Sequence, residues 1–475
     1  MNTKLLKQKI LDLAIRGKLT QQLKSDGSAA DLLKEICDRT QEKTSLRAKR
    51  GNPSPQTIIP LDKNEAPFEI PANWEWIRLG NVCFVTKLAG FEYSDYIVNN
   101  LVEDGIPLFK GKNIQDSKLV LQFESYIPEN ISDSLERSQL RRKCILTPYV
   151  GTIGNMAIFD GSFKAHLGSN VGKIEPFNGI LEEFLFHFLK SDTGYKQLTK
   201  HKKATAQESI SIESIRDVFL PLPPLAEQQR VVEKIQEAFA EIDSIENNKA
   251  LLKTHIKQAR QKILDLAIHG KLVPQNKTDE PASVLLERIT RDNPHYEKLT
   301  DVPLEIPDSW EWVKLGDVCE EMQSAKPKGD SFKYIDIDSI DNTICKIKAP
   351  KVIESKNAPS RASRYTKKGD ILFSLVRPYL RNIAKVEEDN CIASTGFYVC
   401  SPKNINENYC YYLMISHYVV DGLNQYMKGD NSPSISSKNI IEYPIPLPPL
   451  AEQKRIVTRI EEIFKSLDEI SLHLV

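Results

Sequence analysis

The chain contains two copies of one sequence unit. Three blocks occur twice in the same order, and the third, Pro-Leu-Pro-Pro-Leu-Ala-Glu-Gln, is identical in both copies. Matched blocks in the same order indicate two similar structural units. The pairs are residues 8–19 with 261–272, 70–76 with 306–312, and 221–228 with 446–453.

The segments between the second and third blocks differ from each other. They share little beyond their length and a loose pattern of short strands and turns. The sequence therefore predicts a common frame that carries two different inserts. Two equal frames with unequal inserts imply two similar docking sites and two different recognition tasks.

The frame has the pattern of a helix that packs on another helix. After Pro223 and Pro224, apolar residues recur in steps of four and three, and Gly270 is suited to end the helix. Residues 246–249 interrupt the stripe and predict a stutter or bend. Without a break the helix would be about 70 Å long at ~1.5 Å per residue. The apolar positions are Val231, Ile235, Ala238, Ile242, Ile245, Leu252, Ile256, Ala259, Ile263 and Leu266, then Ile456, Ile460, Ile463, Leu467 and Ile470 in the second copy.

The repeat is cut in the middle of this helix. The block offsets of 225 and 253 place Val475 and Met1 at positions equivalent to 250 and 254 of the central helix. We expect the two terminal segments to meet and to rebuild a second long helix, antiparallel to the central one. The result would be a pseudo-twofold, circularly arranged duplication.

Each insert reads as an α+β domain, with short strand-like runs bounded by Gly, Pro and Asn and with helices near its end. The predicted fold class is α+β: two domains joined by two long antiparallel helices. The expected segments are an N-terminal helical segment 1–65, a first domain 66–223, a helical spacer 224–300, a second domain 301–448 and a C-terminal helix 449–475.

The charge of the chain has to be considered segment by segment. With 64 basic and 64 acidic residues, the chain is not a protein that coats nucleic acid indiscriminately. Basic residues nevertheless gather in both inserts, where lysine and arginine can neutralise phosphates and arginine can read guanine edges. The DNA-binding candidates are Lys110, Lys112, Arg141, Arg142, Lys143, Lys200, Lys202, Lys203, Arg361, Arg364, Lys367, Arg377 and Arg381.

The helical frame supplies a second set of candidates. An amphipathic helix repeated in two copies can present the same docking surface to two copies of a partner. The predicted frame and docking residues are Leu225, Gln228, Ile235, Ile242, Ile263, Leu266, Leu450, Gln453, Ile460 and Leu467.

Several classes of function lack support in the sequence. There is no methyltransferase Asp/Asn-Pro-Pro-Tyr/Phe tetrad, no Walker phosphate loop and no dinucleotide fingerprint. The eight cysteines are scattered without zinc-ligand spacing, so we interpret them as reduced thiols. We find no signal peptide and no apolar run long enough to span a membrane, which predicts a soluble, cytoplasmic protein. We expect no catalytic residue, cofactor or metal in this chain.

Together, the duplicated Pro-Leu-Pro-Pro-Leu-Ala-Glu-Gln, the repeated Ile-Leu-Asp-Leu-Ala-Ile-x-Gly-Lys-Leu and the Trp-Glu-Trp entry to divergent inserts resemble the specificity subunit of type I restriction-modification enzymes. The resemblance implies two target-recognition domains that read a bipartite, interrupted site in double-stranded DNA. It also implies two adenine-methylating modification subunits that use S-adenosylmethionine, and two motor-nuclease restriction subunits that use ATP and Mg²⁺.

The residues leave two other hypotheses about the function open. A self-contained nuclease or methyltransferase would need catalytic motifs that this sequence does not have. A scaffold that binds proteins but not DNA would account for the frame, yet it leaves the two basic and unequal inserts unexplained.

Overall fold

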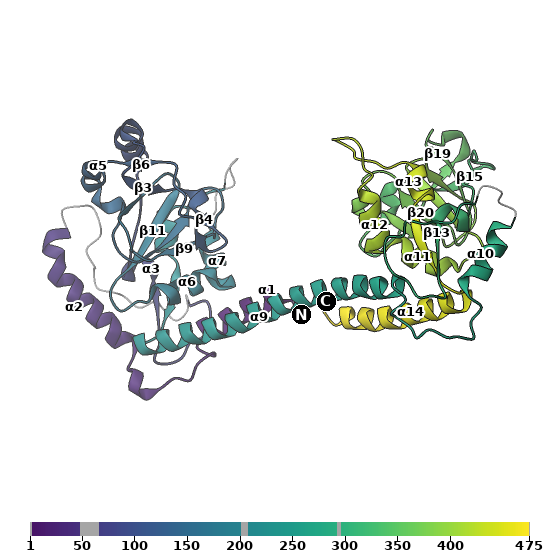
Figure 1. The fold of residues 1–475 in the computed structure, drawn as a ribbon. Coiled ribbons are helices and arrows are strands. Elements are labelled where there is room, and N and C mark those ends of the chain that lie inside the picture. Colours follow the sequence, from purple (N-terminus) through teal and green to yellow (C-terminus); the bar gives the residue numbers. More distant parts are fainter. Residues whose placement is uncertain (1, 48–65, 201–207, 292–295, 475) are drawn as a thin grey trace. The chain divides into compact units, whose positions relative to one another are not determined.

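The computed structural model describes residues 2–47, 66–200, 208–291 and 296–474. The chain divides into two compact units, residues 1–247 and 248–475. Both units mix helices with small sheets (Figure 1), which confirms the predicted α+β class with two repeated domains. None of the described helices is long and apolar enough to cross a membrane.

The first unit contains two four-stranded sheets, in the orders β2-β11-β8-β9 and β6-β3-β10-β7. The first sheet is antiparallel, and the second contains the parallel pair β10 and β3. The strands are β1 (Glu75–Arg78), β2 (Cys83–Lys87), β3 (Ile106–Phe109), β4 (Ile114–Gln115), β5 (Lys118–Leu119), β6 (Tyr126–Ile127), β7 (Gln139–Leu140), β8 (Cys144–Pro148), β9 (Ala157–Phe159), β10 (Ala165–Leu167), β11 (Val171–Pro176) and β12 (Phe219–Leu222).

The helices of the first unit belong partly to the insert and partly to the frame. Ser191 separates α6 from α7, because its hydroxyl accepts a hydrogen bond from Gly194 N and so begins a new helix. The helices are α1 (Thr3–Ile15), α2 (Ala29–Arg47), α3 (Leu79–Val82), α4 (Gly90–Glu92), α5 (Glu129–Ser134), α6 (Glu182–Lys190), α7 (Asp192–Thr199), α8 (Ile212–Arg216) and α9 (Leu225–Ile268), the last of which continues into the second unit.

The second unit repeats this plan with sheets in the orders β14-β23-β20-β21 and β18-β15-β22-β19. Ser416 divides its late helical stretch as Ser191 does in the first unit. Its strands are β13 (Glu311–Lys314), β14 (Cys319–Glu320), β15 (Ser331–Ile335), β16 (Ile340–Asp341), β17 (Lys346–Ile347), β18 (Lys351–Glu354), β19 (Ala362–Thr366), β20 (Ile371–Ser374), β21 (Ile383–Lys385), β22 (Cys391–Ser394), β23 (Phe397–Pro402) and β24 (Pro444–Leu447). Its own helices are α10 (Ala282–Thr290), α11 (Glu407–Met414), α12 (His417–Asn424), α13 (Ser437–Ile441) and α14 (Leu450–Leu472).

A two-stranded sheet joins the beginning and end of each insert. In the first unit β1 pairs antiparallel with β12, so that Trp76 lies opposite Pro221. In the second unit β13 pairs with β24, and Trp312 lies opposite Pro446. The two repeated blocks are therefore neighbours in space, which explains why they persist together while the residues between them diverge.

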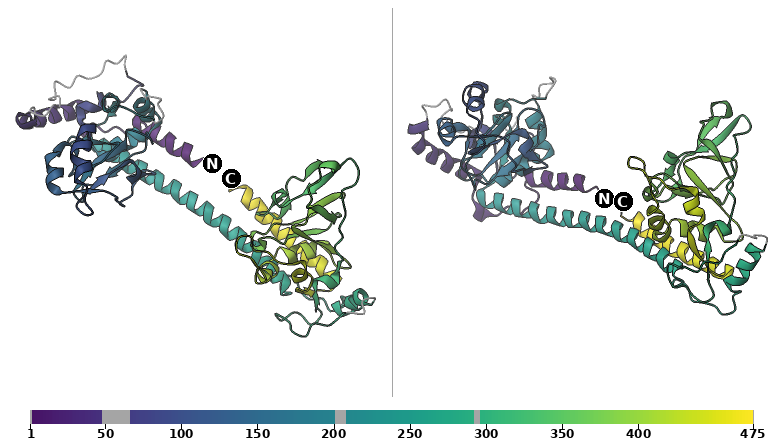
Figure 2. Two further views of the ribbon diagram at one scale, coloured as in Figure 1. Left: turned by 90° about the horizontal axis from the view of Figure 1, so that it is seen from above. Right: turned by 45° about the horizontal axis from the view of Figure 1, so that its top comes forward.

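Frame helices run antiparallel within each unit. In the first unit, Lys7 of α1 pairs with Asp243 of α9, and the loop after α1 reaches back to Glu227 at the start of α9. In the second unit, Arg260 of α9 pairs with Asp468 of α14. Figures 1 and 2 show α1 beside the first part of α9, and α14 beside its last part. The predicted meeting of the two termini depends on how the units are placed, and it stays a prediction.

The central helix α9 is continuous through the polar residues 246–249, which interrupt its apolar stripe. α9 runs for 44 residues without interruption, so residues 246–249 do not end it, and the stutter or bend expected there stays a prediction. Gly270 follows it with φ +65°, as predicted for a residue that ends a helix. Polar residues facing solvent can interrupt an apolar stripe without interrupting the backbone hydrogen bonds.

Candidate DNA-recognition domains and helical frame

A buried carboxylate holds the start of α9 against the rest of the first unit. Glu227 is fully buried and accepts hydrogen bonds from Trp74 Nε1 at 2.9 Å and from Gln22 Nε2 at 2.8 Å. Trp74 precedes β1 and Gln22 follows α1, so three segments distant in sequence meet at one side chain. We call these three residues the Glu227 cluster.

The second unit builds the same arrangement, which we call the Glu452 cluster. Glu452, at the start of α14, accepts hydrogen bonds from Trp310 Nε1 at 3.1 Å and from Gln275 Nε2 at 2.6 Å. Burial raises the pKa of the Glu452 carboxyl above its usual range. The tryptophans of both clusters therefore act as buried hydrogen-bond donors.

The glutamine that ends the repeated block attaches each frame helix to its insert. Gln228 Oε1 accepts from Leu181 N at 2.9 Å, and its Nε2 donates to Gly179 O at 3.1 Å. Gln453 Oε1 accepts from Asn406 N at 2.8 Å. Both glutamines are fully buried, so the identical Pro-Leu-Pro-Pro-Leu-Ala-Glu-Gln blocks form the connection between helix and domain.

An ion pair adds to each connection. Arg230 Nη2 lies 2.5 Å from Asp26 Oδ2, and Arg455 Nη2 lies 2.6 Å from Asp279 Oδ2. Sequence reasoning missed these four residues and also Gln22 and Gln275. The signal was present, because all of them keep the offsets of the repeated blocks, 253 for the residues after α1 and α9 and 225 for those in α9 and α14.

The predicted frame residues fall into three groups by exposure. Leu225 and Leu450 occupy equivalent positions and are 37% and 39% exposed. Ile263, Leu266 and Leu467 are partly buried. The other five are buried inside their own unit, where they hold it together and offer no surface to a partner: Gln228, Ile235, Ile242, Gln453 and Ile460.

Four of the six described DNA-binding candidates of the first unit have a carboxylate partner. Lys112 pairs with Glu124, Arg142 with Glu175 and Lys143 with Glu183. Such pairs reduce the positive potential that a phosphate would meet. The remaining paired cation is Arg141, whose Nη2 lies 2.8 Å from Asp133 Oδ1.

Two other candidates of the first unit form no ion pair with the residues that the structure describes, although the pKa of the Glu124 carboxyl is lowered mainly by Lys112 and further by the nearby Lys110. Lys110 Nζ donates to Ser125 Oγ at 2.8 Å, and Lys200 is exposed at the end of α7. Lys202 and Lys203 lie outside the described residues.

In the second unit, more of the DNA-binding candidates lack a carboxylate partner among the described residues. Arg361 and Arg377 are exposed and have no carboxylate partner among the described residues. Arg364 makes only a 3.5 Å contact with Ser324 Oγ, whereas Lys367 Nζ pairs with Glu320 at 2.6 Å. Arg381 is largely buried and donates to Ile415 O at 2.8 Å.

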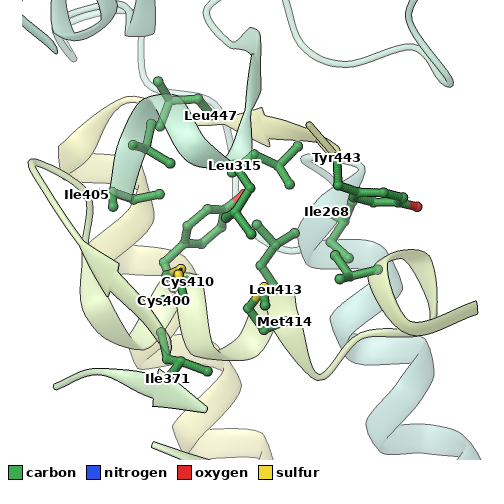
Figure 3. Packing of buried hydrophobic residues seen from close by; sticks show 14 of the residues in the cluster. Ile268, Leu315, Ile371, Cys400, Ile405, Cys410, Leu413, Met414, Tyr443 and Leu447 are labelled. Atoms are coloured by element: carbon green, nitrogen blue, oxygen red, sulfur yellow. The ribbon is translucent and has the colours of Figure 1, made fainter. Parts of the chain in front are cut away.

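Three cysteines that are far apart in sequence meet in the core of the second unit. The Sγ atoms of Cys319 and Cys400 lie 3.0 Å apart, and those of Cys400 and Cys410 lie 3.7 Å apart (Figure 3 labels the last two). All three are free thiols, and they are near enough together to hold a metal ion. The neighbouring thiols and burial raise the pKa of Cys400 well above its usual range.

The equivalent positions in the first unit indicate whether these three cysteines serve packing or metal binding. Cys83 pairs with Pro176 as Cys319 does with Pro402, and the positions equivalent to Cys400 and Cys410 hold Ile174 and Leu185. Both are buried in the apolar core. Packing therefore accounts for the thiols, because cysteine behaves as a small hydrophobic residue when buried.

Comparison with known proteins agrees with this architecture. Residues 71–254 and 307–473 each match the family described as the type I restriction modification DNA specificity domain. The chain belongs to this family. The two matches coincide with the two copies of the repeat, so this family member carries two specificity domains. It is a specificity subunit, whose role is recognition.

Relatives of similar length are known for this specificity subunit. It is 23% identical to the type I restriction enzyme EcoAI specificity subunit of Escherichia coli, over 98% of this chain and 90% of that protein. The EcoEI specificity subunit of Escherichia coli is also 23% identical, over 99% and 90%.

Solved structures show the same fold. The HsdS subunit from Thermoanaerobacter tengcongensis has a TM-score of 0.55 and 19% identity, covering 87% of this chain and 94% of that chain. A structure reported for complex assembly and conformational transition of the type I R-M system has a TM-score of 0.56 and 21% identity, covering 86% and 94%.

Proposed function

We propose that this specificity subunit binds a bipartite, interrupted site in double-stranded DNA, with each of its two domains reading one half. The observation that carries the proposal is the duplicated attachment of unequal inserts. The Glu227 and Glu452 clusters hold both inserts on their helices in the same way, while the inserts differ in their exposed cations and loops. Equal attachment fixes where each domain sits on its helix, and unequal inserts determine which bases are read.

The proposed recognition domains are residues 66–223 and 301–448. Residues 1–65, 224–300 and 449–475 would form the frame between them. Phosphate contacts would come above all from the exposed Lys200, Arg361 and Arg377, and from the partly buried Lys110, because cations without a carboxylate partner neutralise phosphates most effectively.

The proposed partners are two modification subunits and two restriction subunits. The modification subunits would methylate adenine with S-adenosylmethionine, and the restriction subunits would supply ATP- and Mg²⁺-dependent cleavage. This chain would contribute no cofactor site. A complex that acts on cellular DNA would work in the cytoplasm. Leu225 and Leu450 support twofold docking, since they expose the same apolar side chain at equivalent positions of the two units.

The test is to map methylated adenines in a methylation-free host that expresses this chain with its modification subunit, beside a control without this chain. We expect one bipartite motif with a fixed gap, present only when the chain is present. Exchanging the insert 301–448 for that of another specificity subunit should change one half of the motif only.

The alternative hypothesis, a scaffold that binds proteins but not DNA, predicts a different result in the same experiment. If an assembled complex that is active with another specificity subunit produced no chain-dependent motif, and if the purified complex showed no salt-dependent DNA binding, the chain would be a scaffold. A motif that was altered in both halves by one insert exchange would contradict the assignment of one domain to each half.

A further inference from the structure

The same loop occurs in both domains, after the strands β8 and β20. Val150 forms a bridge with Ser209, and Val376 forms the equivalent bridge with Ser434. At the far end of the loops, the next strand pairs back in the same way, with Ile145 opposite Ile158 in β9 and Ile371 opposite Lys385 in β21. The segments 150–155 and 376–382 are therefore equivalent, and the second is one residue longer.

These loops differ at two positions that have left-handed backbone. In the first domain these positions hold Gly151, with φ +89°, and Gly154, with φ +83°. In the second domain they hold Arg377, with φ +48°, and Arg381, with φ +58°. Left-handed backbone favours glycine and is unfavourable for a side chain with a Cβ atom. Arginine at both positions is therefore retained at a cost in stability, and such residues concentrate at binding sites.

The two arginines have different surroundings. Arg381 is largely buried, and its Nη1 donates to Ile415 O, just after α11, at 2.8 Å. It attaches the loop to the helical part of the domain. Arg377 is exposed, and its guanidinium makes a single hydrogen bond among the described residues, from Nη2 to Asn431 O at 2.8 Å. Most of its donors are therefore available to a ligand.

Arg377 lines an open groove of about 660 Å³ in the second domain. The polar lining includes Lys348, which is exposed and has no carboxylate partner among the described residues, and the exposed carboxylate of Asp338. Leu380 adds an apolar side chain that is 41% exposed. The groove thus combines a planar donor fork, a carboxylate and a lysine point charge, beside the neutral polar side chains of Asn342, Asn382 and Ser432.

We infer that this groove is the base-reading element of the second domain, and that Arg377 reads the guanine of a G·C pair in the major groove of DNA. The inference rests on the proposed function. A guanidinium donates two parallel hydrogen bonds to guanine O6 and N7, and a carboxylate accepts from cytosine N4. Arg377 and Asp338 supply these two complementary groups in one groove. Lys348 is suited to a backbone phosphate, because an ammonium is a point charge without fork geometry.

The test measures competition binding of the assembled complex, with its modification subunits, to its mapped target and to duplexes changed at one base pair each. Arg377→Gly is the informative variant, because glycine suits the backbone and occupies the equivalent position in the first domain. It should keep or raise the melting temperature. Discrimination at one G·C pair, in the half-site that changes when residues 301–448 are exchanged, should fall by roughly 5- to 150-fold.

Two further variants separate base reading from charge. Lys348→Ala removes a charge from the same groove and should weaken binding to all duplexes alike. Arg377→Lys keeps the charge and should lose discrimination as Arg377→Gly does. An unchanged base preference in Arg377→Gly, a change in the other half-site, or uniform weakening like that of Lys348→Ala would each overturn the inference. A wild-type complex without any sequence preference would instead overturn the proposed function, and the inference with it.

Discussion

Glu452 is a buried charge whose hydrogen bonds hold the second domain to its helix. Replacing it by alanine would leave Trp310 Nε1 and Gln275 Nε2 without their acceptor. Because an unsatisfied buried donor loses its solvation without compensation, we expect Glu452→Ala to lower the free energy of unfolding by about 1–3 kcal/mol. Urea unfolding measures this loss. The exposed Glu462 on the same helix provides the matched control, and its alanine variant should change stability by less than about 0.5 kcal/mol.

The pH dependence of this position has a definite sign. Burial raises the pKa of Glu452, so the folded protein holds this proton more tightly than the unfolded chain does. Stability from this group therefore falls as pH rises from the ordinary glutamate pKa through the raised folded value. Glu452→Gln cannot ionise, so its stability relative to the wild type should increase over this pH range. A constant or decreasing difference between the two proteins would contradict the assignment.

At the scale of single residues, the sequence locates repeated positions but does not predict which residues they contact. Both Pro-Leu-Pro-Pro-Leu-Ala-Glu-Gln blocks were recognised as repeated, but Glu227 and Glu452 were not among the predicted residues, and their partners could not be found from local patterns. Trp74 and Gln22 lie 153 and 205 residues from Glu227. Only the fold brings them together. Lys112 and Lys143 were predicted from sequence as DNA-binding candidates, but their carboxylate partners, Glu124 and Glu183, likewise depend on tertiary packing.

At the scale of elements, one glycine ends the first frame helix of each unit. Gly17 and Gly270 both have φ +65°, and a Cβ atom on either would lie 2.3 or 2.4 Å from Cγ of Pro71 or Pro307. Lys18 N donates to Leu13 O at 2.8 Å and Lys271 N to Leu266 O at 2.9 Å, which closes the helix end. The glycine thus ends the helix and lets the repeated Ile-Pro block approach it.

We expect Gly17→Ala and Gly270→Ala each to destabilise the protein by at least about 1 kcal/mol, because the left-handed backbone alone disfavours alanine by that amount. The contact with proline adds to this cost. Thermal unfolding of the two variants is the measurement. Gly111→Ala serves as control, since its Cβ atom would meet nothing within 4 Å. Melting temperatures equal to that of the control would refute the role given to these glycines.

The helical frame was the most predictable element, but its apolar stripe predicts only some of the buried positions. Val231 and Ile235 are buried as expected, because the first insert covers the start of α9. Ile245 and Leu252 continue the same spacing but remain 41% and 39% exposed. Periodicity identifies the apolar face of a helix, whereas the residues that cover it come from other parts of the fold. The loops 150–155 and 376–382 were less accessible still, since positive φ at Arg377 has no signature in composition.

At the scale of the whole molecule, the duplication explains how one chain builds two complete units from a repeat that is cut inside a helix. Each unit combines a helix ending in Gly-Lys-Leu with a helix beginning after Pro-Leu-Pro-Pro: α1 with the start of α9 in the first unit, and the end of α9 with α14 in the second. This composition followed from the block offsets alone. The placement of the units, and so the predicted pairing of the termini, involves contacts that the repeat does not encode.

Two equal units should bind two equal partners, and the exposed Leu225 and Leu450 allow this to be tested one unit at a time. Burying one leucine in an interface contributes about 1.5 kcal/mol or more, so a buried glutamate there should weaken docking at least tenfold. We expect Leu225→Glu and Leu450→Glu each to yield a complex with one modification subunit, and the double variant to bind none, as measured by mass photometry without DNA. Leu121→Glu alters a leucine of the first insert that is 59% exposed, and it should retain both subunits. Retention of both subunits by the double variant would exclude these leucines from the docking surface and leave the partly buried Ile263, Leu266 and Leu467 as the remaining predicted contacts.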